Sequence, residues 1–204
     1  TGEDTLSLHD ALPIFESPGG VVHGYGLAAS QLQRLRDKQI PLTVAVDKVA
    51  ASGGYMMACV AQKIIAAPFA IVGSIGVVAQ LPNFNRLLKK HDVDVELHTA
   101  GQFKRTLTIF GENDDKAREK FKAELETVHQ QFKQFVSEHR PRMDMEQIAT
   151  GEHWLAAEAK KLGLVDELRT SDDYLLSQFE QKQVIKVTYH NKKGLADRFS
   201  HAAS

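Results

Sequence analysis

Short apolar runs typical of strands alternate with helical stretches along this chain, and glycine turns separate several of them. The β-branched run at residues 40–46 predicts a buried strand, and the apolar residues 55–61 predict a short buried helix. Further strands are expected at residues 63–67 and 70–72, and an apolar stripe at helical spacing predicts a long helix over residues 114–139. Strands that alternate with helices predict an α/β fold with a largely parallel sheet flanked by helices.

Two weaker patterns and the ends of the chain complete the predicted organisation. Residues 93–99 alternate between apolar and polar side chains and predict a half-exposed strand, and a further strand is expected at residues 184–189. Residues 1–15 show no clear periodicity and are interpreted as a doubtful segment, for which a native and a non-native origin both remain open. We therefore expect a domain over residues 16–170 and a C-terminal extension over residues 171–204.

Composition excludes several classes of protein. The chain has 25 Lys and Arg against 26 Asp and Glu, so its net charge of −1 gives no basic face for nucleic acid. A single cysteine excludes an internal disulfide and the usual cysteine-based zinc sites. No glycine-rich loop has the spacing of a phosphate-binding or dinucleotide-binding motif. We expect no metal, nucleotide or organic cofactor.

Two glycine-rich turns carry the residue types that acyl transfer needs. In the run Ala-Ala-Ser-Gly-Gly at residues 50–54, Ser52 stands where a strand is expected to become a helix. Gly53 follows without a side chain, so its amide can approach an oxyanion, and Gly19 in the turn at residues 17–20 can supply a second amide. The alternative is that both are ordinary turns and Ser52 only caps a helix.

A nucleophilic serine needs a base, and the sequence offers two kinds. None of the nine histidines stands in a recognisable catalytic arrangement, and we interpret His153 as a surface or packing residue. A lysine serves as a base only when it is neutral, which requires burial. Lys104 follows the expected strand at residues 93–99 in a turn of small residues. Taken alone, Lys104 is more readily interpreted as a solvated loop lysine than as a base.

Five motifs in order resemble the signal peptide peptidase A family of serine peptidases, and most of all its membrane-anchored bacterial members. They are Glu-Ser-Pro-Gly-Gly at residues 16–20, Asp-Lys-Val-Ala-Ala-Ser-Gly-Gly-Tyr at 47–55, Ile-Val-Gly-Ser-Ile-Gly-Val at 71–77, Thr-Ala-Gly-Gln-Phe-Lys-Arg at 99–105 and Ala-Lys-Lys-Leu-Gly-Leu-Val-Asp at 159–166. The resemblance covers residues 16–168.

The resemblance implies a ClpP/crotonase-type fold and a serine–lysine catalytic dyad. Matched motif by motif, Ser52 corresponds to the nucleophile and Lys104 to the general base. Ser74 corresponds to the serine that positions the lysine, and Gly19 and Gly53 correspond to the oxyanion-hole donors. The expected function is therefore that of a serine endopeptidase.

The expected substrates are apolar peptides with small side chains at the cut, such as remnant signal peptides. Because the lysine must be desolvated, its apolar neighbours are expected to wall the substrate pocket. These neighbours are Val72, Ile75, Phe103 and Leu107.

The resemblance also implies partners and a location. It implies a homo-oligomeric ring and a membrane anchor upstream of residue 16, so we expect the N-terminal part of the sheet to be missing from this chain. The expected location is the bacterial inner membrane, with the catalytic domain on the periplasmic side. Two rival functions remain open at this point. They are a crotonase-type acyl-CoA enzyme, for which the turns offer no carboxylate, and a non-catalytic scaffold that binds membrane-protein segments.

Overall fold

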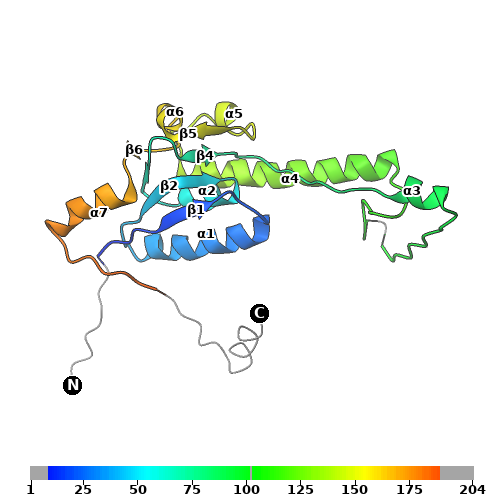
Figure 1. Ribbon diagram of the computed structural model, residues 1–204, viewed down its shortest axis with the longest axis horizontal. Coiled ribbons are helices and arrows are strands. Elements are labelled where there is room, and N and C mark those ends of the chain that lie inside the picture. Colours follow the sequence, from blue (N-terminus) through cyan, green and yellow to red (C-terminus); the bar gives the residue numbers. More distant parts are fainter. Residues whose placement is uncertain (1–8, 102, 189–204) are drawn as a thin grey trace, which may run out of the picture. The chain divides into compact units, whose positions relative to one another are not determined.

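A mixed sheet forms the centre of the protein. The computed structural model describes residues 9–101 and 103–188, which fall into two units divided between Ser171 and Asp172. Within the described residues the sheet has six strands, in the order β5-β4-β2-β3-β6 with β1 paired to β2 (Figure 1). The strands are β1 (Ile14–Ser17), β2 (Thr43–Ala51), β3 (Lys63–Ala66), β4 (Ile71–Gly73), β5 (His153–Leu155) and β6 (Glu167–Leu168).

The pairing around β2 is almost entirely parallel. β2 pairs in parallel with β1, β3 and β4, and β6 pairs in parallel with β3. Only β5, which pairs with β4, runs antiparallel among the described strands. Parallel neighbours require crossover connections, and helices supply most of them. The α/β prediction with a largely parallel sheet is confirmed.

Seven helices are found in the described part of the chain. They are α1 (Val22–Asp37), α2 (Gly53–Ala58), α3 (Asn85–Lys90), α4 (Asp115–His139), α5 (Met145–Ile148), α6 (Ala156–Lys161) and α7 (Ser171–Phe179). The carboxylate of Asp114 caps α4 by accepting from the Ala117 amide at 2.7 Å. α4 ends before Pro141, because proline disfavours helical backbone at the residue that precedes it. None of the helices in these residues is long and apolar enough to cross a membrane.

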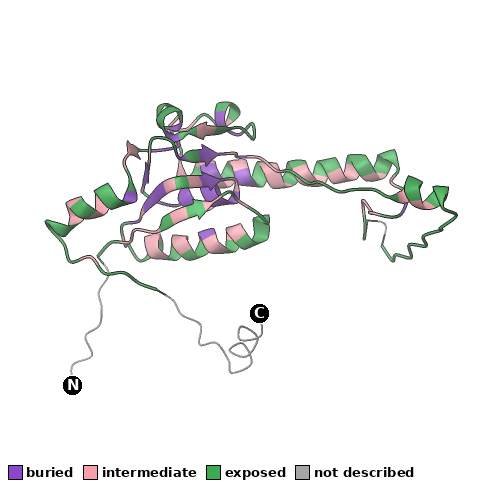
Figure 2. Cartoon of the chain, in the orientation of Figure 1, coloured by how far each residue is buried: buried purple, intermediate pink, exposed green. Residues whose placement is uncertain are grey.

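The core lies between the sheet and the helices that cover it. Val44 and Val46 of β2 are fully buried, and so is Tyr55 of α2, whose hydroxyl donates to the Leu164 carbonyl at 2.9 Å. Helix α4 contributes Phe132 and Val136, which lie in its C-terminal half. Figure 2 shows this gradient, since the N-terminal half of α4 carries no buried residue. Only the C-terminal half of α4 is therefore part of the core.

The structure differs from the sequence predictions at three strands. Residues 93–99 form no strand, because no neighbouring strand is there to pair with their backbone groups. Residues 184–188 also form no strand, and residue 189 lies outside the described residues. β1 begins at Ile14, so the boundary expected after residue 15 falls inside a paired strand, and Ala11 and Phe15 pack against the core.

Candidate active site

Ser52 lies at the point where the central strand β2 ends and helix α2 begins. Its backbone has a φ of 52° and a ψ of −120°, which is a strained conformation for a residue with a side chain. The turn is held from two directions. The Ser52 amide donates to the Gly73 carbonyl at 2.8 Å, and the Ser52 carbonyl accepts from the Met56 amide at 2.9 Å. The Ser52 hydroxyl makes no capping bond to α2, so the simple capping role is not observed.

Gly19 and Gly53 both lie against Ser52, in places where no side chain fits. Gly19 has a φ of 101°, and a Cβ there would lie 2.7 Å from the Cβ of Ser52 and 3.0 Å from the amide nitrogen of Gly53. A Cβ on Gly53 would lie 2.4 Å from Cγ of Tyr25. The structure therefore brings the turn at residues 17–20 together with the turn at Ser52, as the sequence predicts.

Two backbone amides are available at this junction. Gly53 is the first residue of α2, so the helix supplies no acceptor for its N–H group. The Gly19 amide donates to the hydroxyl of Ser17 at 3.3 Å, which is long for a bond of this kind. A full negative charge on a nearby oxygen would be a stronger acceptor than a neutral hydroxyl. The geometry is suited to stabilising an oxyanion formed on a carbonyl attacked by Ser52.

Ser74 stands at the end of the neighbouring strand β4 and has a φ of 51°. Its amide donates to the Glu152 carbonyl at 2.6 Å, and its hydroxyl donates to the Gly151 carbonyl at 3.3 Å. Because β2 and β4 are parallel, Ser52 and Ser74 follow strands that end at the same edge of the sheet. This edge is where α/β proteins with parallel sheets place their ligands.

Lys104 lies in a different part of the same unit. It is exposed, and it belongs to residues 77–113 between β4 and α4, which we call the arm and which includes α3. The arm lies along the N-terminal half of α4. There Thr106 donates to Glu124 at 3.4 Å, and the ammonium of Lys120 stands 5.4 Å from the centre of the Phe103 ring.

One chain does not bring Lys104 to Ser52. The turn at Ser52 lies between the core residues Ala50 and Tyr55, and the buried residues that α4 contributes to this core begin at Phe132. Phe132 lies eight positions after Glu124 in this helix, which is about 12 Å along the axis at about 1.5 Å per residue. Figure 1 shows the arm leaving the sheet after β4 and running along α4, with α2 beside the sheet and α3 at the other end of α4. The nucleophile and the base that the motifs indicate are apart in the single protomer.

The four apolar residues expected to wall a substrate pocket are also divided. Val72 and Ile75 are fully buried in the core, so neither side chain is exposed to line a surface pocket. Phe103 is 48% exposed and Leu107 is half-buried, and both belong to the arm. In one protomer these four side chains do not line a common pocket.

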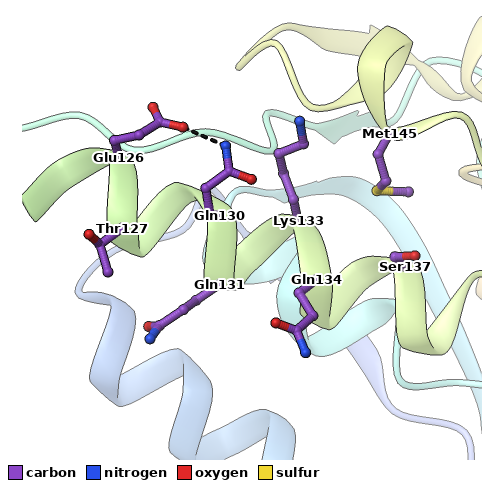
Figure 3. A pocket seen from close by; sticks show the side chains of 8 residues that line it. All are labelled: Glu126, Thr127, Gln130, Gln131, Lys133, Gln134, Ser137 and Met145. Atoms are coloured by element: carbon purple, nitrogen blue, oxygen red, sulfur yellow. Dashed lines mark hydrogen bonds between the residues drawn. The ribbon is translucent and has the colours of Figure 1, made fainter. Parts of the chain in front are cut away.

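A shallow, open groove in the described structure lies elsewhere. It follows the surface of α4 and reaches α5, and Figure 3 shows its polar lining, with Gln130 donating to Glu126. Glu126, Thr127, Gln130, Gln131, Lys133, Gln134, Ser137 and Met145 line it. None of these residues belongs to the turns that carry Ser52 or Gly19.

Other groups with catalytic potential have structural roles. Burial raises the pKa of the Cys59 thiol to about 12, so Cys59 is protonated at neutral pH and is a core residue. His153 is exposed on β5, where it pairs with Gly73. In the part of the chain that the structure describes, no three His, Cys, Asp or Glu side chains are grouped so that they could hold a metal ion.

Most of this chain matches a known family of peptidases. The model of peptidase family S49 matches residues 34–185, which include Ser52, Ser74, Lys104 and Gly53. The sheet and its flanking helices agree with the ClpP/crotonase-type fold expected for this chain. Gly19 lies before the matched region, so the family model does not include it, and the structure places it beside Ser52.

Several of the similar proteins are described as proteases. A protein of Haemophilus influenzae described as "Probable protease SohB" is 63% identical over 188 residues, which is 92% of this chain and 53% of that protein. A protein of Buchnera aphidicola subsp. Acyrthosiphon pisum with the same description is 56% identical over 193 residues, which is 94% of this chain and 57% of that protein. The chain spans about half the length of these relatives.

Proposed function

We propose, since this chain belongs to peptidase family S49, that it hydrolyses peptide bonds with Ser52 as the nucleophile. The observation that carries the proposal is the meeting of two glycine turns at a strained serine. Ser52, Gly53 and Gly19 lie in direct contact, although 32 residues separate Gly19 from Ser52 in the chain. A packing role alone gives no reason to place a serine with positive φ between two amides of residues that lack side chains.

The chemistry follows from these groups. The Ser52 hydroxyl adds to the peptide carbonyl while a base takes its proton, and the Gly19 and Gly53 amides stabilise the oxyanion of the tetrahedral intermediate. The same base returns the proton to the amine as the C–N bond breaks, which leaves an acyl group on Ser52. Water then adds to this ester in the same way, and Ser52 is released with the carboxylic acid product.

We assign Lys104 as the base and place it in the site of a neighbouring copy of the chain. The support is that one protomer holds Lys104 on an exposed arm, away from its own Ser52. Ser74 follows the neighbouring strand β4 at the same sheet edge as Ser52. Its hydroxyl oxygen can therefore accept a hydrogen bond from an incoming ammonium or amine. A homo-oligomeric ring would repeat the same contact from copy to copy.

The composition of the arm supports an assembly of this kind. The arm exposes a concentration of large apolar side chains, and a soluble monomer rarely exposes so many in one segment. They are Val78, Leu81, Phe84, Leu87, Val93, Val95, Leu97, Phe103 and Phe110. Its residues 93–99 alternate between apolar and polar side chains but form no strand in the described structure, so a second copy can cover this segment.

We further propose that the substrates are apolar peptides with small residues at the cut, such as remnant signal peptides. The proposed location is the periplasmic side of the bacterial inner membrane. A neutral Lys104 requires a site from which water is excluded, and such a site also penalises charged substrate side chains, because these would lose their hydration.

A panel of quenched fluorescent peptides tests this function. We expect purified protein to cleave peptides with Ala or Ser on both sides of the cut at least about 100-fold more efficiently, in kcat/KM, than matched peptides with Lys or Glu there. Ser52→Ala is the control that must remove cleavage. Turnover of acyl-CoA thioesters without peptide cleavage would replace the proposal with a crotonase-type reaction. Peptide binding that Ser52→Ala leaves unchanged, with no cleavage by either protein, would indicate a scaffold.

A further inference from the structure

Tyr25 of helix α1 belongs to none of the motifs, yet it contacts both glycine turns. Its hydroxyl donates to the Gly19 carbonyl at 3.0 Å and lies 2.7 Å from the hydroxyl of Ser17. The Gly19 amide in turn donates to the Ser17 hydroxyl at 3.3 Å. Three hydrogen bonds therefore join Tyr25, Ser17 and the two peptide groups of Gly19.

The proton positions in this network follow from counting donors. Tyr25 has one hydroxyl proton, and the Gly19 carbonyl can only accept, so the Tyr25 proton lies on that bond. The bond between the two hydroxyls must then use the Ser17 proton, with Tyr25 as acceptor. Ser17 keeps its lone pairs for the Gly19 amide. The result is a closed ring that runs from Gly19 through Ser17 and Tyr25 back to Gly19, and each bond polarises the next.

The aromatic ring of Tyr25 makes a second set of contacts. A Cβ on Gly53 would lie 2.4 to 2.8 Å from three atoms of that ring, and a Cβ on Gly20 would lie 2.9 Å from a fourth. The ring therefore occupies the space that the missing side chains leave. Tyr25 is half-buried there, and it packs against the amide donor at the start of α2 as well as the one in the turn at residues 17–20.

We propose that Tyr25 is a positioning residue that holds both oxyanion donors. Its hydrogen bonds with the Gly19 carbonyl and the Ser17 hydroxyl orient the turn that carries Gly19, and its aromatic ring packs against Gly53. The third bond of the hydrogen-bonded ring, from the Gly19 amide to Ser17, is the long one that an oxyanion replaces. This inference rests on the proposed function of Ser52. Amide donors stabilise an oxyanion only when they are oriented before the reaction. The turn that carries Gly19 includes the exposed residues Pro18 and Gly20, so its backbone needs an external contact to keep one orientation.

Removing single hydroxyls tests this role. Tyr25→Phe keeps the aromatic ring, and Ser17→Ala opens the hydrogen-bonded ring elsewhere without touching Tyr25. We expect each change to lower kcat for a good peptide by about 10-fold and to leave KM within about twofold, which is less than the loss of a whole donor. The double variant Ser17→Ala/Tyr25→Phe is expected to fall no further than either single one, because either change opens the same ring.

The affinity for a peptide aldehyde separates positioning from general stability. The aldehyde forms a hemiacetal oxyanion on the nucleophile, so its Ki should rise in proportion to the fall in kcat. Ser30→Ala is the matched control, because it removes a hydroxyl on α1 that donates to the Leu27 carbonyl away from the site. This control should leave kcat and Ki unchanged.

Each outcome decides the inference. Wild-type kcat and aldehyde affinity in folded Tyr25→Phe and Ser17→Ala, with Ser52→Ala inactive, would overturn the role of Tyr25 and leave the proposed function intact. Additive losses in the double variant would overturn the closed ring. Full activity in Ser52→Ala would remove the proposed function and this inference with it. If Tyr25→Phe fails to fold, the kcat and the aldehyde Ki of Ser17→Ala decide whether the inference holds.

Discussion

Ser52→Ala and Lys104→Ala are each expected to lower kcat for a peptide substrate by at least about 10⁴-fold, without loss of the folded state. Ser52→Ala removes the atom that attacks the carbonyl, and Lys104→Ala removes the base that takes its proton. Lys104 is exposed in the protomer, so its replacement costs little stability, and thermal unfolding of both variants should match the wild type. The activity is measured with a peptide that the wild type cleaves well.

The two inactive variants also test where the base comes from. When they are co-expressed, the Lys104→Ala chain supplies an intact Ser52 and the Ser52→Ala chain supplies an intact Lys104. If the base comes from the neighbouring copy, about a quarter of the sites in mixed oligomers contain both intact residues, and we expect activity to return to about a quarter of the wild-type level. If both groups of a site came from one chain, no mixed site would be complete. Activity that stays at the level of the separate variants would therefore contradict the transfer of Lys104 between copies.

Gly19→Ala and Gly53→Ala are expected to lower kcat by about 100-fold or more each, which is the usual cost of losing an oxyanion donor. At Gly19 the new Cβ would meet the Cβ of Ser52 at 2.7 Å in a backbone with a φ of 101°. At Gly53 it would meet the ring of Tyr25 at 2.4 Å. In both cases an amide must move away from the position beside Ser52. Steady-state hydrolysis reports kcat and KM for each variant.

Gly24→Ala is the matched control for these two changes. Gly24 belongs to helix α1, and nothing lies within 4 Å of the position that its Cβ would take. Alanine there should leave kcat unchanged and stabilise the protein by up to about 1 kcal/mol through its higher helix propensity. A Gly19→Ala or Gly53→Ala enzyme with the kcat of this control would show that the amide beside Ser52 does not act in catalysis.

The sequence predicted the part of the site that short segments form on their own. Ser52 and Gly53 are neighbours in the chain, and a strand followed by Ser-Gly-Gly fixes their turn. Gly19 could be added because it follows another strand of the same parallel sheet, and such strands end at one edge. Local sequence patterns are therefore enough to predict that Ser52, Gly53 and Gly19 lie at the same edge of the sheet.

The placement of Lys104 could not be predicted in this way. The arm that carries it contributes no residue to the buried core, and residues 93–99 form no strand in the described structure despite their alternating pattern. A strand pattern states only that one face can be buried, and the partner can belong to another chain. The same reason separates Phe103 and Leu107 from Val72 and Ile75.

The contacts of Tyr25 could not be predicted from the sequence for a different reason. It stands in a helix three residues from its beginning, where a tyrosine is an ordinary packing residue. Its partners Ser17 and Gly19 precede it by eight and six residues, a spacing that no common motif marks. The only usable signal was the nearby turn of two glycines, whose missing side chains leave room for an aromatic ring.

The most direct test of Ser52 as the nucleophile is to identify the residue that forms a covalent bond with a serine-directed fluorophosphonate. The account predicts one adduct per active site, on the peptide that contains Ser52, and slower labelling in Lys104→Ala because the serine then lacks its base. Ser30→Ala, away from the site, should be labelled like the wild type. An adduct on another residue, or hydrolysis that continues when Ser52 is replaced by alanine, would contradict the account.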